Sequence, residues 1–264
     1  MNRSQPVITT RSLKKSFDGE EYVLRGIDLE IYPGQVIGYI GPNGAGKTTT
    51  VKILIGMIPE YEGEVDLFGH NLSSESLIVK QRIGYVPETA ALYDTLTPIE
   101  WLQFIGQIYK IPLPEVTERA NQMLTIFDLA SVAGERMNTF SKGMKQKVLI
   151  ISALIHDPDL LFLDEPLSGL DANSAMVIKE ILAQLAGLGK TIFYCSHVMD
   201  VVERVCDRII IIDRGEIIAN GSFDELQAQS REKSLENIFS SLTGSSGHEE
   251  KADQFIAAFR GGAL

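Results

Sequence analysis

A glycine-rich loop between an apolar run and a helix constrains the fold of this chain more than any other feature. The loop consists of Gly41, Pro42, Asn43, Gly44, Ala45, Gly46, Lys47, Thr48 and Thr49. Its spacing is that of the phosphate-binding loop, whose glycines let backbone N–H groups converge on one anion at the start of a helix. We expect Lys47 to reach the outer phosphates and the Thr48 hydroxyl to hold Mg²⁺. A turn that only joins a strand to a helix does not need all four fixed positions, so the sequence predicts a nucleoside triphosphate site.

The composition is typical of a soluble globular protein. The 264 residues are 44% hydrophobic and 22% charged, which allows a full core in one or two domains. No apolar run approaches the roughly 18 residues of a membrane span, and residues 1–10 do not resemble a signal peptide. A net charge of −11 argues against nucleic acid as a partner and against direct adhesion to anionic lipid. We therefore expect a cytosolic chain whose role at a membrane, if it has one, requires a protein partner.

Apolar patterns and turn signals predict an α/β fold with three parts. These are an N-terminal antiparallel β layer, a mostly parallel sheet, and an inserted helical subdomain at about residues 89–155. Strands are expected at residues 7–13, 27–31, 36–40, 63–68, 82–86, 160–165, 191–195, 208–213 and 216–219. Helices are expected from residue 47, from 97 to 112, at 115–129, from 141, and at 173–188, 223–229 and 235–242. Residues 1–243 are expected to form the nucleotide-binding domain, followed at 244–264 by a linker and a short helix.

Two of the predicted strands end in groups that could perform chemistry. Residues 160–165 form an apolar run that ends in Asp164 and Glu165, and residues 191–195 lead directly to His197. Parallel strands deliver such groups at the edge where the phosphate loop emerges. We expect Asp164 to serve Mg²⁺ and Glu165 to accept a proton from the attacking water. An Asp-Glu-Pro strand exit and a lone histidine are often only structural, but beside a phosphate loop a polarising or sensing role for His197 is the better interpretation.

A second loop could also bind an anion. Ser141, Lys142, Gly143 and Met144 open a basic helix, and they combine a hydroxyl, a glycine and free N–H groups at a helix N-terminus. Alone, this stretch would be an ordinary capped helix start.

In combination, these motifs resemble the ATP-binding-cassette (ABC) ATPases over about residues 5–243. In that family the signature loop of one subunit closes over the γ-phosphate held by the other, so that two ATP molecules are sandwiched in a head-to-tail dimer. The resemblance implies that residues 141–144 contact ATP of the opposite subunit, that Phe17 stacks on the base, and that Glu88 joins Thr48 and Asp164 at Mg²⁺. It implies a dimer-communication loop formed by Ser168, Gly169, Leu170 and Asp171. Lys47, Glu165 and His197 become the expected catalytic residues.

The chain departs from the usual family pattern at two places. The usual signature has glycine and glutamine where this sequence has Lys142 and Met144, whereas Ser141 and Gly143 match. Glu88 stands where the family typically has a glutamine that touches Mg²⁺ and senses the membrane partner. A carboxylate can also ligate Mg²⁺, so we expect activity to survive this change.

Residues 85–88, 140–147 and 235–239 resemble ATPases that pair with separate ABC-2-like exporter permeases, such as those of Ecs type. This resemblance implies an ATP-hydrolysing subunit at the cytoplasmic face of the membrane, attached through an integral-membrane permease. The subunit would act as a homodimer, or as a heterodimer with a second ABC ATPase. The alternatives are an importer ATPase and a soluble non-transport ABC protein. A further alternative, a non-hydrolysing nucleotide sensor, is disfavoured by the presence of Glu165 and His197.

Overall fold

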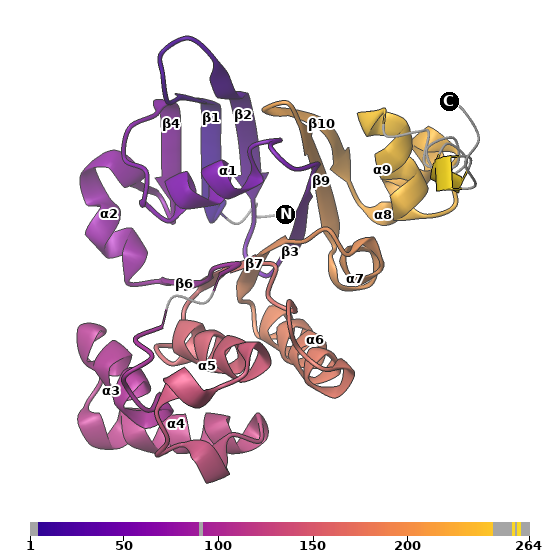
Figure 1. Ribbon diagram of the computed structural model, residues 1–264. Helices are drawn as coiled ribbons and strands as arrows, with labels where there is room; N and C mark the ends of the chain where they lie inside the picture. The colour runs from indigo at the N-terminus through magenta and orange to yellow at the C-terminus, as the bar shows by residue number, and fades with distance from the viewer. Residues whose placement is uncertain (1–4, 90–91, 245–254, 257, 260–264) are drawn as a thin grey trace.

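The described strands form two sheets that share a core, and helices cover the outer face of the larger sheet (Figure 1). The computed structural model describes residues 5–89, 92–244, 255–256 and 258–259. The predicted fold class is confirmed: an antiparallel N-terminal sheet lies beside a mostly parallel one, and a group of helices is inserted into the chain.

The smaller sheet is antiparallel, with the strand order β2-β1-β4-β5. Its strands are β1 (Ile8–Ser16), β2 (Tyr22–Ile31), β4 (Glu62–Leu67) and β5 (His70–Asn71). Sequence analysis predicted β2 only from residue 27, and this start is wrong because the strand begins at Tyr22. Gly26 has a φ of 112° beside a register shift, and this irregularity breaks the alternation of buried and exposed side chains.

The larger sheet has the strand order β10-β9-β3-β8-β7-β6, and only β10 runs antiparallel to its neighbour. Its strands are β3 (Val36–Ile40), β6 (Ile83–Val86), β7 (Leu160–Asp164), β8 (Thr191–Cys195), β9 (Arg208–Asp213) and β10 (Glu216–Gly221). All five residues of β3, of β7 and of β8 are buried, as expected for central strands covered on both faces. The carboxyl ends of β3, β6, β7 and β8 therefore meet at one edge of the sheet.

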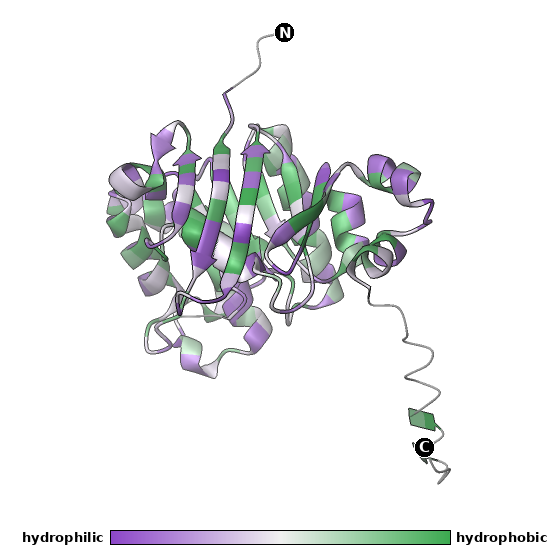
Figure 2. Ribbon diagram, turned by 90° about the horizontal axis from the view of Figure 1, so that it is seen from above, coloured by the Kyte–Doolittle hydropathy of each residue, from purple (hydrophilic) through white to green (hydrophobic). Residues whose placement is uncertain are grey.

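Hydrophobic side chains fill the space on both faces of the larger sheet, and Figure 2 shows hydrophilic residues mainly on the outside. One core lies between the two sheets and includes residues of helix α1 (Lys47–Leu54). The other lies between the larger sheet and helices α3 to α9. Tyr39, Phe162 and Phe193 are fully buried and pack against one another across three neighbouring strands in tilted pairs, with ring centroids 5.0 and 5.3 Å apart.

The inserted helices form a separate layer below the sheet in Figure 1. They are α3 (Pro98–Ile108), α4 (Leu113–Ile126) and α5 (Lys142–Leu154), with the 3-10 turns Ala130–Val132 and Met137–Thr139 between α4 and α5. Thr97 and Glu100 form a capping box at the start of α3. The Trp101 indole donates to the Ser152 hydroxyl at 2.6 Å, which joins α3 to α5 inside the core.

Sequence analysis missed one helix and misplaced the start of another. Helix α2 (Leu72–Lys80) was not predicted, because its serines are weak helix formers, although Asn71 caps it by accepting from the Ser73 N–H. We also expected the preceding helix to extend to residue 112 and the next helix to begin at residue 115. The structure begins α4 at Leu113, so Pro114 lies in its first turn, where a missing N–H costs nothing.

The remaining helices are α6 (Ala172–Gly187), α7 (Met199–Val205), α8 (Phe223–Ser230) and α9 (Leu235–Thr243). Residues 255, 256, 258 and 259 are helical, and Phe255 and Phe259 are exposed. The predicted linker at 245–247 and Ala252 of the predicted tail helix lie outside the described residues. Within the part of the chain that the structure describes, no helix is both long and apolar enough to span a membrane.

Candidate active site

Close packing at its glycines fixes the path of the phosphate-binding loop between β3 and α1. Gly44 and Gly46 have φ values of 80° and 106°, a region that side-chain-bearing residues rarely adopt. A Cβ on Gly46 would lie 2.6 Å from the Leu24 side chain, and one on Gly41 would collide with the Ile212 carbonyl oxygen. Strands β2 and β9 thus leave room only for glycine at these two positions.

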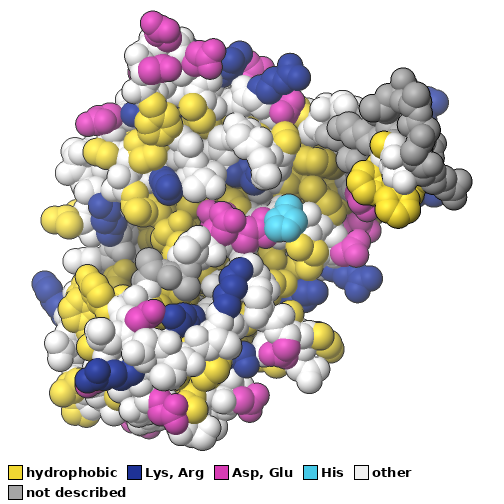
Figure 3. Space-filling view, viewed as in Figure 1, with side chains coloured by type: hydrophobic (Ala, Val, Ile, Leu, Met, Phe, Trp, Pro, Cys, Tyr) yellow, Lys and Arg dark blue, Asp and Glu magenta, His cyan; other side chains and the backbone are white. Residues whose placement is uncertain are grey.

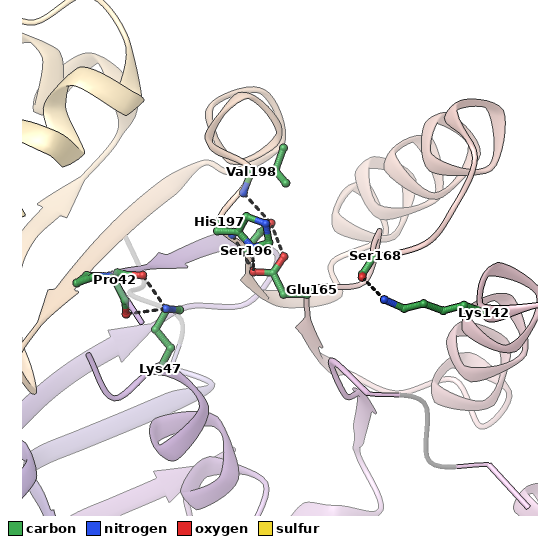
Figure 4. A network of polar contacts seen from close by, with 9 residues as sticks. Pro42, Lys47, Lys142, Glu165, Ser168, Ser196, His197 and Val198 are labelled. Atoms are coloured by element: carbon green, nitrogen blue, oxygen red, sulfur yellow. Dashed lines mark hydrogen bonds and ion pairs between the residues drawn. The ribbon is translucent and has the colours of Figure 1, made fainter. Parts of the chain in front are cut away.

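The Lys47 side chain folds back over its own loop. Its Nζ donates to the carbonyl oxygens of Gly41 at 2.6 Å and Pro42 at 3.0 Å (Figure 4). The ammonium is half-buried and is held at the mouth of the loop. It therefore lies close to where the converging N–H groups of the loop would place a phosphate.

A cavity of about 500 Å³ extends from this loop across the carboxyl ends of the central strands. Its lining residues are Val23, Asn43, Gly44, Gly46, Lys47, Thr48, Thr49, Glu88, Asp164, Glu165 and His197. Figure 3 shows acidic side chains beside a histidine in the middle of this face. The structure thus brings together the loop, the three predicted carboxylates and the predicted histidine. Gly41, Pro42 and Ala45 lie behind this lining, and Ala45 is buried.

Asp164 is the most buried of the three carboxylates, at 4% exposed. Burial, together with the carboxylates of Glu88 and Glu165, raises the pKa of Asp164 from 3.8 to about 6, against the opposing effect of Lys47 and Lys52. Negative charge is therefore crowded at this point, and the two lysines compensate for it only in part.

The donor set at this point suits a hard divalent cation. Thr48, Glu88 and Asp164 all present oxygen atoms to the same cavity, and oxygen atoms are the ligands that Mg²⁺ takes in phosphate sites. A cation would also relieve the charge crowding that disfavours ionised Asp164. The residues present therefore fit Mg²⁺.

Glu165 is held by three donors from the loop after β8. Its Oε1 accepts from the His197 backbone N–H at 2.8 Å and from His197 Nδ1 at 2.7 Å, and its Oε2 accepts from the Ser196 hydroxyl at 3.0 Å (Figure 4). Glu165 also has a φ of 48°, a strained left-handed conformation for a residue with a side chain. The His197 side chain is 77% exposed, so its other ring nitrogen is free to face a ligand in the cavity.

The loop of residues 141–144 lies apart from this cavity. Ser141 caps α5 by accepting from the Met144 N–H at 3.2 Å, and Lys142 donates to the Ser168 hydroxyl at 2.9 Å. Gly143 lies so close to Gly169 that a Cβ there would be 2.6 Å from the Gly169 carbonyl oxygen. Figure 4 shows Lys142 and Ser168 on the side of Glu165 away from Lys47.

Residues 168–171 connect the end of β7 to α6. Asp171 caps that helix by accepting from the Ser174 N–H at 2.9 Å and from the Ser174 hydroxyl at 2.6 Å, and these bonds lower the Asp171 pKa. Leu170 is half-buried against the core that holds the inserted helices. This stretch thus borders the loop of residues 141–144 rather than the cavity.

Phe17 lies at the tip of the smaller sheet, outside the lining of the cavity. Its side chain is 64% exposed, and the Lys15 ammonium lies 5.0 Å from the ring centroid. The ring is therefore not part of the hydrophobic core. Its stacking on a base stays a prediction.

Sequence analysis did not single out three residues that contribute to the site. Val23 lines the cavity, Ser196 binds Glu165, and the charge of Lys52 acts on Asp164. Ser196 could have been found, because it directly follows a buried parallel strand. Val23 could not, because it belongs to the part of β2 that the alternation pattern missed.

The sequence of this chain is similar to those of known proteins. The ABC transporter family model matches residues 24–168, which is more than half of the chain. This chain belongs to the ABC transporter family. The linearmycin resistance ATP-binding protein LnrL of Bacillus subtilis is 40% identical over 83% of this chain and 70% of its own length. A Nod factor export ATP-binding protein of Cupriavidus metallidurans is 36% identical over 83% of this chain and 72% of its own length.

Solved structures of ABC proteins have the same fold. One is described as the ATP-binding subunit of an ABC transporter; it has a TM-score of 0.84 and 30% identity, covering 89% of this chain and 99% of that one. Another is a dimeric ATP-binding cassette in a post-hydrolysis state bound to ADP and Pi. It has a TM-score of 0.75 and 26% identity, covering 81% of this chain and 98% of that one. The present chain is accordingly an ABC ATPase that binds ATP.

Proposed function

We propose that this ABC ATPase powers a membrane exporter by ATP-driven, head-to-tail pairing of two nucleotide-binding subunits. The observation that carries the proposal is the separation of two anion-binding loops within one chain. The phosphate-binding loop lines the cavity, whereas residues 141–144 are not part of its lining. One nucleotide bound to this chain could not use both loops. A second subunit that supplies its own signature loop would complete the site.

The residues of the cavity have distinct proposed roles in hydrolysis. Lys47 exchanges its two carbonyl partners for the outer phosphates of ATP, and the loop N–H groups hold the same phosphates. Glu165 accepts the proton of the attacking water, because its carboxylate is fixed in place by Ser196 and His197. His197 reaches the γ-phosphate with the ring nitrogen that does not bind Glu165.

Thr48, Glu88 and Asp164 would hold Mg²⁺ in this proposal. When bound, the ion neutralises charge on the phosphate oxygens during transfer. Ionised Asp164 is the ligand that gains most from the ion, since burial and its carboxylate neighbours disfavour its charge. Glu88 presents a carboxylate where the family usually has an amide, so this chain brings one more negative charge to the metal.

The names of two relatives support export as the direction of transport. The Nod factor relative is named as an export protein and LnrL as a resistance protein. Both names fit removal of a molecule from the cell, and both relatives cover most of this chain. They support an exporter over an importer. The permease would select the substrate.

An aromatic surface on the inserted helices is the proposed permease contact. Tyr93, Phe104 and Ile108 are 63%, 43% and 58% exposed, and Tyr93 and Phe104 pack edge-on against each other at 6.4 Å. A groove of about 410 Å³ lies beside them, between the inserted helices and the end of β6, and Trp101 and Tyr109 line it. An apolar groove with an aromatic rim suits a short helix of the permease. Binding there would keep the ATPase at the cytoplasmic face of the membrane.

We further propose that residues 1–243 act as one nucleotide-binding domain and that 244–264 form a linker and a short helix. Helices α8 and α9 support this boundary. Leu226 and Ile238 are buried, and they belong to the core shared with the inserted helices.

Pairing of two subunits is tested with Glu165→Gln, which keeps the size of the side chain and removes the base. Positioned acid–base groups contribute about 10²–10⁴-fold in rate, so hydrolysis should collapse while ATP binding persists. We expect size-exclusion chromatography with light scattering to show a dimer with ATP and a monomer with ADP. Adding Ser141→Arg places a bulky side chain where the opposite γ-phosphate must fit, and the dimer should disappear.

A double variant that still dimerises with ATP contradicts the head-to-tail arrangement. A Glu165→Gln chain that stays monomeric contradicts pairing of two copies of this chain and leaves a second ABC ATPase as its partner.

A further inference from the structure

Contacts within the chain join the first turn of α5 to the segment of residues 166–171. The Lys142 ammonium donates to the Ser168 hydroxyl at 2.9 Å (Figure 4). One turn further along α5, the buried Gln146 amide donates to the Pro166 carbonyl oxygen at 3.1 Å. With the close approach of Gly143 to the same segment, α5 touches it at three points. Helix α5 therefore supports this segment along its length.

Lys142 makes this contact with its whole side chain. Gly169 turns with a φ of 78°, and a Cβ built there would lie 3.0 Å from Cδ of Lys142. The methylene stem thus covers the glycine, and the ammonium reaches the hydroxyl just before it. The glycine usual at position 142 in the family has no side chain, so a loop with that glycine could not make this contact.

The other end of the segment is fixed to Glu165. The Ser168 backbone N–H donates to the Glu165 carbonyl oxygen at 3.1 Å, which closes a tight turn. The Glu165 carboxylate in turn accepts from Ser196 and His197. A continuous path of hydrogen bonds therefore runs from Lys142 through Ser168 to Glu165.

We propose that Lys142 is a positioning residue for ATP hydrolysis: by holding Ser168, it fixes the turn that sets the Glu165 carboxylate. The inference rests on the proposed function, in which Glu165 is the base. The strained backbone of Glu165 makes such support necessary, because a φ of 48° persists only where the surroundings hold it. Lys142 lies outside the cavity, so its effect falls on turnover and not on capture of ATP by the same chain.

Steady-state ATPase kinetics of the full chain test this role. Lys142→Met keeps most of the stem and removes the donor, and we expect kcat to fall roughly threefold to tenfold, the effect of one net hydrogen bond. KM for ATP should not change. Lys142→Arg should restore most of kcat because it keeps a charged donor. Ser168→Ala should reproduce the loss, and the double variant Lys142→Met, Ser168→Ala should lose no more than either alone.

Lys179→Met is the matched control, since it removes a lysine from α6 and should leave kcat and the melting temperature unchanged. Additive losses, a raised KM, or a Ser168→Ala variant with full activity would each overturn the inference and assign Lys142 a direct contact with phosphate. These outcomes are separate from a failure of the proposed function. The proposed function fails if hydrolysis survives Glu165→Gln. If hydrolysis needs Glu165 but Lys142→Met leaves kcat unchanged, only the positioning role is refuted.

Discussion

Two residues of this site, Asp164 and Glu165, carry an energetic cost that the folded chain without ligands does not offset. Asp164 has an elevated pKa because it is buried beside two other carboxylates. Glu165 adopts a backbone conformation suited to glycine. Both features destabilise the chain without ligands, and both place a carboxylate where phosphate chemistry needs one. Residues that work against local stability in this way mark function more clearly than buried apolar side chains do.

The raised pKa of Asp164 predicts how stability depends on pH. Without Mg²⁺ and nucleotide, the unfolded chain releases the Asp164 proton near pH 3.8 and the folded chain only near pH 6. The unfolded state therefore binds fewer protons between these values, and stability falls as pH rises through this window. Asp164→Asn should raise the free energy of unfolding at pH 8 by roughly 1–3 kcal/mol, and this gain should shrink below pH 6.

Urea unfolding in EDTA between pH 8 and pH 5 measures this difference. Asp66→Asn, on β4 and away from the cavity, is the control. An Asp164→Asn chain that is less stable than the parent at pH 8 would contradict the assigned charge crowding.

Most of the cavity residues could be predicted from sequence, because the phosphate loop and two strand ends lie in contiguous motifs. Asp164, Glu165 and His197 each follow a buried run, and parallel strands bring such ends to one edge. Lys52 and the bonds of Lys142 could not be predicted, since they depend on where helices α1 and α5 point. Side-chain direction on a helix is set by packing that a linear pattern does not contain.

At the scale of helices and strands, strong local sequence signals predicted element boundaries correctly, whereas elements with weak signals were missed or given a wrong start. The Thr97 capping box and the proline after it marked the start of α3, whereas the serine-rich α2 and the irregular start of β2 were missed. Inserted helix α3 is fixed at two points, its N-terminal cap and the bond from Trp101 to Ser152. The cap is exposed, so its contribution can be measured without disturbing the core.

Thr97→Ala removes the side-chain acceptor for the Glu100 N–H, a bond of 3.2 Å. The loss of a helix cap costs about 1 kcal/mol, so we expect the free energy of unfolding to fall by about that amount. Thr97→Ser keeps the acceptor and should retain most of it. ATP binding should be unchanged in both, because the cavity is built from other elements. Urea titration and nucleotide titration check the two expectations, and an unaltered stability of Thr97→Ala would show that the cap is dispensable.

At the scale of the whole molecule, the two sheets build the nucleotide cavity and the inserted helices provide a second, separate surface. Sequence patterns could predict this division, because alternating strands and amphipathic helices fall in separate stretches of the chain. They could not predict the groove beside Trp101, which forms only where α3, α5 and β6 come together. The two surfaces face different proposed partners, a second ATPase and a permease.

The permease contact predicts where crosslinks form. A cysteine at Phe104, which is 43% exposed beside the groove, should crosslink to a membrane protein in native membranes. The native thiols should not compete, because Cys195 is buried and burial raises the pKa of Cys206 to about 12. Ile218→Cys, on the outer strand β10, is the control and should give no such product. Crosslinks from Ile218→Cys alone would move the docking surface to the opposite side of the molecule.

The separation of the phosphate-binding loop from residues 141–144 also has a genetic consequence. In the proposed pair, each catalytic site draws its base from one polypeptide and its signature loop from the other. In a mixed pair, one chain carries the defect at Ser141 and the other carries the defect at Glu165. Both defects then fall in the same catalytic site, and the other catalytic site is intact. Two alleles that are each inactive alone would complement one another when expressed together, whereas two alleles damaged at different residues of the cavity lining would not.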